Sequence, residues 1–153
     1  MTVQEQAKEL RAVLQMLKAE RNVLADRATE VLEAWNNSLY PITEIMREYN
    51  IPFRNTLIVG ESERGFVVGE AVDADNDRPL LYVYDGLCVH LVDALTDERI
   101  DGPISTAKYI NEANLEHVKA GFEYVRKLKE TAVKGYLEQN NVLKRFVEES
   151  KEE

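Results

Sequence analysis

Apolar residues spaced alternately four and three apart near both ends of the chain constrain the fold more than any other feature of this sequence. The first series, which we name the N-terminal seam, comprises Val3, Ala7, Leu10, Leu14, Leu17, Arg21, Leu24, Ala28, Val31 and Trp35. The second series, the C-terminal seam, comprises Leu115, Val118, Phe122, Val125, Lys129, Ala132, Tyr136, Gln139, Leu143 and Phe146. This spacing places the members of a series on one face of an α-helix, as in helices that pack in coiled coils. We therefore predict a long helix at each end of the chain.

Local signals set the expected ends of the first helix. Thr2, followed three residues later by Glu5, matches a capping box, which satisfies free amide groups where a helix starts. Pro41 lacks the amide hydrogen that a helix interior uses, and poor helix formers occupy positions 36–38 just before it. We therefore expect the long helix to cover residues 2–37.

A short helix and a second long helix complete the helical part of the prediction. Residues 42–49 have helical character, and Asn50 can end that helix by adopting a left-handed conformation. Ser105 or Asn111 could cap the last helix. We expect that last helix over residues 105–149.

The middle of the chain changes from helical to alternating periodicity, which is typical of β-strands. The runs rich in β-branched and aromatic residues are Thr56–Val59, Phe66–Val72, Leu80–Tyr84 and Cys88–Val92. Turn-forming residues separate these runs. We therefore predict a four-stranded antiparallel meander over residues 56–92, followed by a polar connection over residues 93–104.

The hairpin around Asp85 and Gly86 is expected to have a two-residue turn, which would place Val83 opposite Cys88. Both faces of this hairpin would then carry apolar side chains. An antiparallel sheet normally leaves one face polar. We therefore expect the second face to be covered by a helix, by another subunit or by a partner.

Together these elements predict an α+β fold with one domain over residues 1–153. Two long helices with a sheet inserted between them in sequence would most simply fold back as an antiparallel pair, with the sheet at one end. Gly121 and Gly135 lie on one stripe of the last helix. Glycine in a helix interior lowers stability by about 1 kcal/mol relative to alanine. The stripe therefore indicates either that another helix approaches closely or that the two glycines lie on the surface, where they are tolerated.

The charge and cysteine content exclude several function classes. The formal net charge is −9, which argues against binding to nucleic acid or to anionic membranes. The single cysteine, Cys88, cannot form an internal disulfide, and the first residues lack the apolar run of a signal peptide. We therefore expect a cytoplasmic protein whose partner is a protein chain, either another molecule or a further copy of itself.

Cys88 and His90 are the strongest candidates for chemistry, because a Cys/His pair is one route to an activated thiolate. They lie two apart on a predicted strand, and no third group that would orient the histidine is evident nearby in sequence. A buried thiol beside a half-buried histidine is the favoured interpretation. We therefore expect no catalytic residue and no cofactor.

Asp73, Asp75 and Asp77 have the alternate spacing of carboxylates in a calcium-binding loop. An EF-hand loop starting at Asp73 would need glycine and glutamate where Arg78 and Tyr84 stand. The loop is therefore interpreted as a solvated hairpin turn, and we expect no metal site.

The order of a heptad helix, β-hairpins and a second heptad helix resembles an α-class prefoldin subunit. The segments that carry the resemblance are Thr56-Leu57-Ile58-Val59-Gly60, Gly65-Phe66-Val67-Val68-Gly69 and Tyr84-Asp85-Gly86-Leu87-Cys88-Val89. The resemblance implies paired helices that form a tentacle, hairpins that build the base of a hetero-oligomer, and capture of unfolded chains without a nucleotide. The helix tips near Leu10 and Leu143 would then hold the bound chain.

The favoured function is a non-enzymatic, oligomeric protein-interaction module of a holdase-like or scaffold-like kind. One alternative is a small acidic inhibitor or adaptor of a mobile element, which would block a partner protein. A second alternative is a protein or enzyme that binds a small molecule at the sheet. The residues expected to make the interaction are Leu14, Leu17, Arg21, Lys129, Tyr82 and Tyr84.

Overall fold

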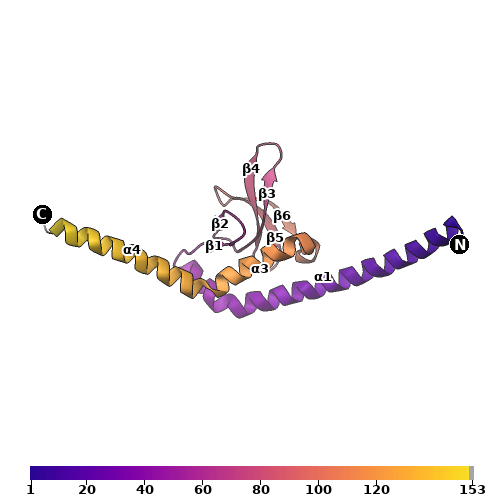
Figure 1. Cartoon of the computed structure of the whole chain (residues 1–153), viewed down its shortest axis with the longest axis horizontal. Helices are drawn as coiled ribbons and strands as arrows, with labels where there is room; N and C mark the ends of the chain where they lie inside the picture. The colour runs from indigo at the N-terminus through magenta and orange to yellow at the C-terminus, as the bar shows by residue number, and fades with distance from the viewer. Residues whose placement is uncertain (152–153) are drawn as a thin grey trace.

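A computed structural model describes residues 1–151 and has two long helices that leave a small α+β body in different directions (Figure 1). The elements are α1 (Val3–Glu48), β1 (Phe53–Arg54), β2 (Glu61–Ser62), β3 (Phe66–Asp73), β4 (Arg78–Tyr84), β5 (Val89–Asp93), β6 (Arg99–Ile104), α2 (Thr106–Tyr109), α3 (Glu112–Arg126) and α4 (Leu128–Lys151). The α+β class, the two long terminal helices and the four-stranded meander are confirmed.

Helix α1 begins where the sequence predicts but ends later. The Thr2 side chain accepts a hydrogen bond from the Glu5 amide, and the Glu5 carboxylate accepts one from the Thr2 amide, so the capping box is present. Asn50 adopts the left-handed conformation, with φ of 54°. The break expected before Pro41 is wrong, because one continuous helix replaces the predicted helices over 2–37 and 42–49.

Pro41 is tolerated because its cost falls on the exposed side of α1. The proline removes the hydrogen bond that the Asn37 carbonyl would accept, and both residues are exposed, so water can reach that carbonyl. On the opposite side, Leu39 and Met46 are buried in the core. Their burial offsets a cost of about 3 kcal/mol for proline in a helix interior.

The sheet has the strand order β3-β4-β5-β6, and every neighbouring pair is antiparallel. Two strand predictions were wrong. The run Thr56–Val59 forms turns and bends instead of a strand, and the expected connection over 93–104 contains the edge strand β6. Pro103 is tolerated because β6 is an edge strand and its pairing with β5 is irregular between Asp101 and Ile104.

The β4–β5 hairpin has a longer turn than expected. Val83 pairs with His90 and Tyr84 with Val89, so the register is shifted by two residues from the predicted one. The shift arises because Asp85 accepts hydrogen bonds from the amides of Leu87 and Cys88 and closes a four-residue loop. Because the shift is even, each side chain keeps its predicted face of the sheet.

Both faces of the sheet are covered by the chain itself. On one face, Phe66 stacks on Phe122 of α3 with ring centroids 4.1 Å apart, and Tyr84 packs beside them. On the other face, Leu81 is buried under the backbone at Gly60, where an added Cβ would lie 3.1 Å from the leucine methyl carbons. The second face therefore needs no other subunit or partner.

Helix α1 and the C-terminal helices run parallel, and the expected antiparallel pair is wrong. Arg21 lies beside Glu112, Trp35 packs edge-on against Phe122, and Tyr49 lines the same groove as Tyr136. Residue numbers therefore increase in the same direction along both helices. The two free ends point away from each other (Figure 1), unlike the tentacle that the prefoldin resemblance implies.

The predicted helix over 105–149 is divided into three helices. Ser105 caps α2 and Asn111 caps α3, so both proposed caps are used. Gly121 lies against strand β3, where an added Cβ would be 2.5 Å from the Val67 carbonyl oxygen. Gly135 has nothing within 4 Å of its would-be Cβ. The glycine at 121 thus permits close approach by a strand rather than by a helix.

Candidate functional site

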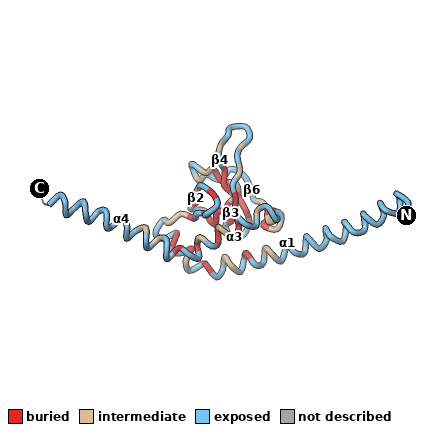
Figure 2. The backbone as a smooth tube through the Cα atoms, in the orientation of Figure 1, coloured by how far each residue is buried: buried red, intermediate tan, exposed pale blue. Residues whose placement is uncertain are grey.

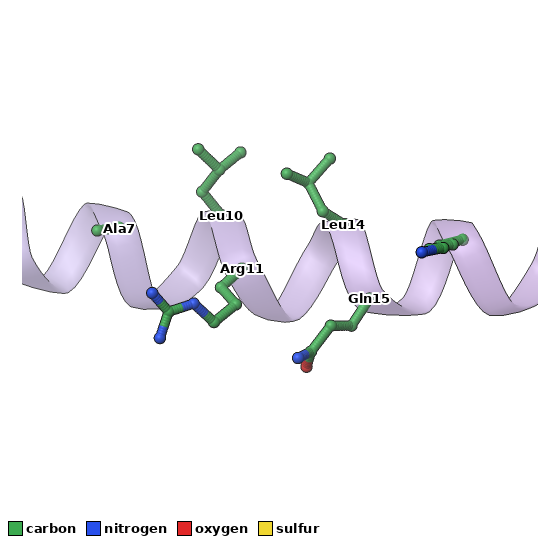
Figure 3. Close-up of a pocket in the computed structure, with 6 residues that line it drawn as sticks. Ala7, Leu10, Arg11, Leu14 and Gln15 are labelled. Carbon is green, nitrogen blue, oxygen red and sulfur yellow. The ribbon is translucent and has the colours of Figure 1, made fainter.

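The apolar face of α1 is buried at one end and uncovered at the other. Leu32 and Leu39 pack in the core, yet every residue from 1 to 24 is exposed (Figure 2). Leu10 and Leu14 project from the same side of α1, while Arg11 and Gln15 project from the opposite side (Figure 3). The exposed fractions of Leu14 and Leu17 are 54% and 55%. The face of α1 that forms the core therefore continues into solvent.

Arg21 marks the place where the N-terminal seam leaves the body. Its side chain is exposed, and it lines a surface hollow with Asn111, Glu112 and Ala113 at the start of α3. The charged residue therefore lies in the uncovered part of the seam, at the level where α3 begins. A polar residue at a seam position can fix the register of a partner helix.

The C-terminal seam follows the same pattern in the opposite direction along the molecule. Val118, Phe122 and Val125 are buried in the body, whereas every residue from 136 to 151 is exposed. Lys129 is exposed and lines the edge of a groove between α1 and α4. This groove has a volume of about 690 Å³, and its apolar walls are formed by Ile42, Ile45, Tyr49, Ile51, Leu128, Ala132, Val133, Tyr136 and Leu137.

The sheet residues expected to contact a partner do not form an open surface. Tyr84 has an exposed fraction of 1% and donates a hydrogen bond to the Gly86 carbonyl, so it lies in the core and not on the surface. Tyr82 is half-buried and packs against Tyr109, with ring centroids 4.9 Å apart. Of the six expected residues, the four on the helices remain accessible.

A cluster of three polar side chains forms at the β4–β5 loop. The Cys88 Sγ lies 3.1 Å from the His90 Nε2, and the Asp85 Oδ2 lies 2.9 Å from the same nitrogen. Asp85 is exposed, Cys88 is half-buried and His90 is buried. Asp85 is therefore the third group that the sequence reasoning did not find.

The loop holds Asp85 in a fixed orientation. Its Oδ1 accepts hydrogen bonds of 2.9 Å and 3.0 Å from the amides of Leu87 and Cys88, which leaves Oδ2 directed at His90. Gly86 adopts φ of 99° and lies against Asn36 of α1. The aspartate three residues before the cysteine, at the start of a turn, is the sequence signal for this arrangement.

The electrostatics of the cluster favour a carboxylate beside a neutral thiol. Burial opposes ionisation of Asp85, but the amides of Cys88 and Leu87, followed by His90, outweigh it and lower the pKa of the carboxyl group. Burial and then the Asp85 carboxylate raise the pKa of the Cys88 thiol. Without a further positive charge, Cys88 is therefore not an activated nucleophile at neutral pH.

No family model, curated protein or solved structure matches this chain. Its function must therefore be argued from the geometry of its own residues. Within residues 1–151, no helix is both long enough and apolar enough to span a membrane.

The cluster does not have the geometry of a nucleophilic triad. In such a triad, one imidazole nitrogen contacts the nucleophile and the other contacts the carboxylate. Here Cys88 and Asp85 both contact Nε2, and the Nδ1 of His90 is buried without a hydrogen-bond partner. The three side chains thus converge on one point and do not form a relay.

The acidic loop at Asp73 is organised by hydrogen bonds within the protein. The Asp73 Oδ1 accepts a hydrogen bond from the Asp75 amide, and its Oδ2 accepts one from Arg78 at 3.1 Å. Arg78 also lies 3.5 Å from Asp93. The carboxylate at the first position of this loop is therefore paired with a cation from the same hairpin.

Proposed function

We propose that this protein is a scaffold-like interaction module that assembles with further copies of itself through the uncovered parts of its two seams. The observation that carries the proposal is the continuity of the apolar face of α1, to which the exposed part of the N-terminal seam belongs. The face that buries Leu32 and Leu39 in the core runs in phase into the exposed Leu10, Leu14 and Leu17. A partner helix on this face would extend packing that the body has already begun.

The length of the uncovered helix supports a partner. Most helical stability in proteins comes from packing of an apolar face rather than from helix propensity. Among the residues that the structure describes, none from 1 to 24 is buried, so this part of α1 has little such packing. Burial against a second copy supplies the missing stabilisation.

The free energy of association indicates that both seams contribute. Leu10, Leu14, Leu17 and Leu24 have exposed fractions of 54–59%. Covering each of these half-exposed leucines gains about 1 kcal/mol, or about 8 kcal/mol for two copies. Association costs roughly 4–15 kcal/mol, so the N-terminal seams alone are marginal. Phe146 and Leu143 of α4, with exposed fractions of 68% and 61%, provide the remaining apolar surface.

Co-purification of two differently tagged copies of the full chain tests this proposal. We expect the wild-type copies to co-purify, and Leu14→Glu combined with Leu17→Glu to abolish this by burying charge in the seam. Glu9→Gln, outside the seam on the same exposed helix segment, is the control and should have no effect. Circular dichroism must show that the charged variant keeps its fold. Equal co-purification of the charged variant, or none of the wild type, would overturn the proposal.

A further inference from the structure

We propose that Asp85, Cys88 and His90 form a binding site for a divalent transition-metal ion of the zinc class. Carboxylate oxygen, thiolate sulfur and imidazole nitrogen are the ligands that Zn²⁺ takes in proteins. The Asp85 Oδ2, the Cys88 Sγ and the His90 Nε2 lie within 4.8 Å of one another. This inference does not depend on how the protein assembles.

The Cys88 and Asp85 side chains converge on one nitrogen atom of His90. His90 Nε2 carries either one hydrogen or one lone pair, yet it faces both the Cys88 sulfur and the Asp85 carboxylate. If Nε2 donates to the carboxylate, the sulfur has no full hydrogen bond to it. If Nε2 accepts from the thiol, its lone pair faces the carboxylate oxygen. One cation among the three atoms satisfies all of them.

The separations between the side chains suit a tetrahedral ion. Metal–sulfur and metal–nitrogen bonds of about 2.3 Å and 2.0 Å place the two ligand atoms about 3.5 Å apart in a tetrahedron, and nitrogen and oxygen about 3.3 Å apart. The observed separations are 3.1 Å and 2.9 Å. Each of these two separations would have to lengthen by about 0.4 Å to admit the ion. The third pair, the Cys88 Sγ and the Asp85 Oδ2, lies within 4.8 Å.

The surroundings hold the ligands in place and leave one position open. His90 has an exposed fraction of 8%, and the backbone at Gly102 is so close that an added Cβ would lie 2.7 Å from Nδ1. Only Nε2 can therefore reach an ion. Asp85 is exposed, so solvent can occupy the fourth position. Three protein ligands with a solvent molecule match the pattern of open zinc sites.

Binding of the ion changes the chemistry of Cys88. The sulfur binds as a thiolate, so its proton passes to solvent as the metal–sulfur bond forms. The positive charge of the ion also offsets the Asp85 carboxylate, which otherwise opposes ionisation of the thiol. The site would therefore exchange one proton for one divalent cation.

Titration of the chelator-treated full chain with Co²⁺, and then competition with Zn²⁺, tests the site. Thiolate-bound tetrahedral Co²⁺ gives a near-ultraviolet charge-transfer band and intense visible bands. We expect one Co²⁺ per chain with these bands, and their loss when Zn²⁺ displaces it. Cys88→Ser should abolish the charge-transfer band and weaken binding at least tenfold. Asp85→Asn should also weaken binding at least tenfold.

The control uses the second histidine of the chain. His117→Gln should bind Co²⁺ as the wild type does, because His117 lies on α3 and not in the cluster. His90→Gln removes a buried ligand and can unfold the protein, so Cys88→Ser, at a half-buried position, decides the question. Absence of the charge-transfer band in the wild type, or equal affinity in Cys88→Ser, would overturn the proposal.

Discussion

Trp35 packs edge-on against Phe122, with ring centroids 5.4 Å apart and an angle of 66° between the ring planes. The guanidinium of Arg126, one turn further along α3, lies 4.7 Å from the centre of the Trp35 ring. These contacts join α1 to α3, and the two helices run in the same direction. The free ends of the two helices therefore leave the body in different directions and cannot cover each other.

Phe122 is expected to be the residue on which the body depends most. It has an exposed fraction of 0% and contacts Trp35, Phe66 and Tyr84. Phe122→Ala should lower the free energy of unfolding by about 3–5 kcal/mol, measured by urea denaturation. Val59→Ala, at a position with an exposed fraction of 96%, should change it by less than about 0.5 kcal/mol. Similar effects of the two substitutions would contradict the described core.

The two helical glycines are expected to respond in opposite directions to alanine. Gly121→Ala should destabilise the protein by about 1–3 kcal/mol, because its Cβ would meet the Val67 carbonyl oxygen of β3. Gly135→Ala should stabilise α4 by up to about 1 kcal/mol, because the space around it is open. Chemical denaturation measures both. A stable Gly121→Ala protein would show that α3 does not lie this close to the sheet.

Asn55 is expected to tolerate no replacement by a carboxylate. Its side-chain amide is buried and donates hydrogen bonds of 2.7 Å to the carbonyls of Val67 and His117. Asn55→Asp would place a buried negative charge against two carbonyl oxygens, and should cost at least about 3 kcal/mol at pH 7. Asn37→Asp, at an exposed position of α1, is the matched control. Thermal denaturation that shows equal stability of the two variants would refute this arrangement.

Tyr109 is expected to make the protein sensitive to alkali. Its hydroxyl donates a hydrogen bond to the Val68 carbonyl, and burial, with a smaller contribution from Tyr82, raises its pKa above the ordinary value of 10.0. A raised pKa in the folded state means that the stabilisation is complete below about pH 10 and is lost as pH rises toward the folded-state pKa.

Removal of the Tyr109 hydroxyl separates the contribution of its hydrogen bond from the dependence of stability on pH. Tyr109→Phe should cost about 1 kcal/mol at pH 7 through loss of the hydrogen bond, and should reduce the fall in stability above about pH 10. Tyr40→Phe, at an exposed position, should leave both quantities unchanged. Unfolding measured by fluorescence from pH 7 to pH 11 would show this. An unchanged alkaline slope in Tyr109→Phe would contradict the account of this residue.

The elements with strong local signals could be predicted from the sequence. The period of the seams requires helices, and the Thr2 and Glu5 side chains can satisfy a helix start without help from the rest of the fold. Asn50 similarly carries its own signal, because asparagine adopts the left-handed conformation more readily than most residues. The seams also indicate which helix faces are apolar, although not what covers them.

Features that depend on tertiary contacts could not be predicted in this way. Pro41 remains in α1 because Leu39 and Met46 hold the other side of the helix in the core. The edge strand β6 has no alternating apolar pattern, since most of its residues are exposed, and its pairing with β5 alone defines it. The direction of the C-terminal helix likewise follows from the stacking on Phe122, which no local spacing specifies.

The candidate metal site was missed for a related reason. Cys88 and His90 were recognised as a pair, but the turn was expected to contain two residues. The four-residue loop places the Asp85 carboxylate at His90, and this depends on hydrogen bonds from Leu87 and Cys88. An aspartate at the first position of a turn can always accept such bonds, so the longer loop was available as an alternative.

The central claim is that the uncovered parts of the seams bind further copies of the chain. Light scattering coupled to size-exclusion chromatography, at micromolar concentrations of the wild-type protein, tests it most directly. We predict a mass of at least two 153-residue chains. The mass of a single chain throughout the concentration range would contradict the claim, since the apolar faces of α1 and α4 would then remain in water.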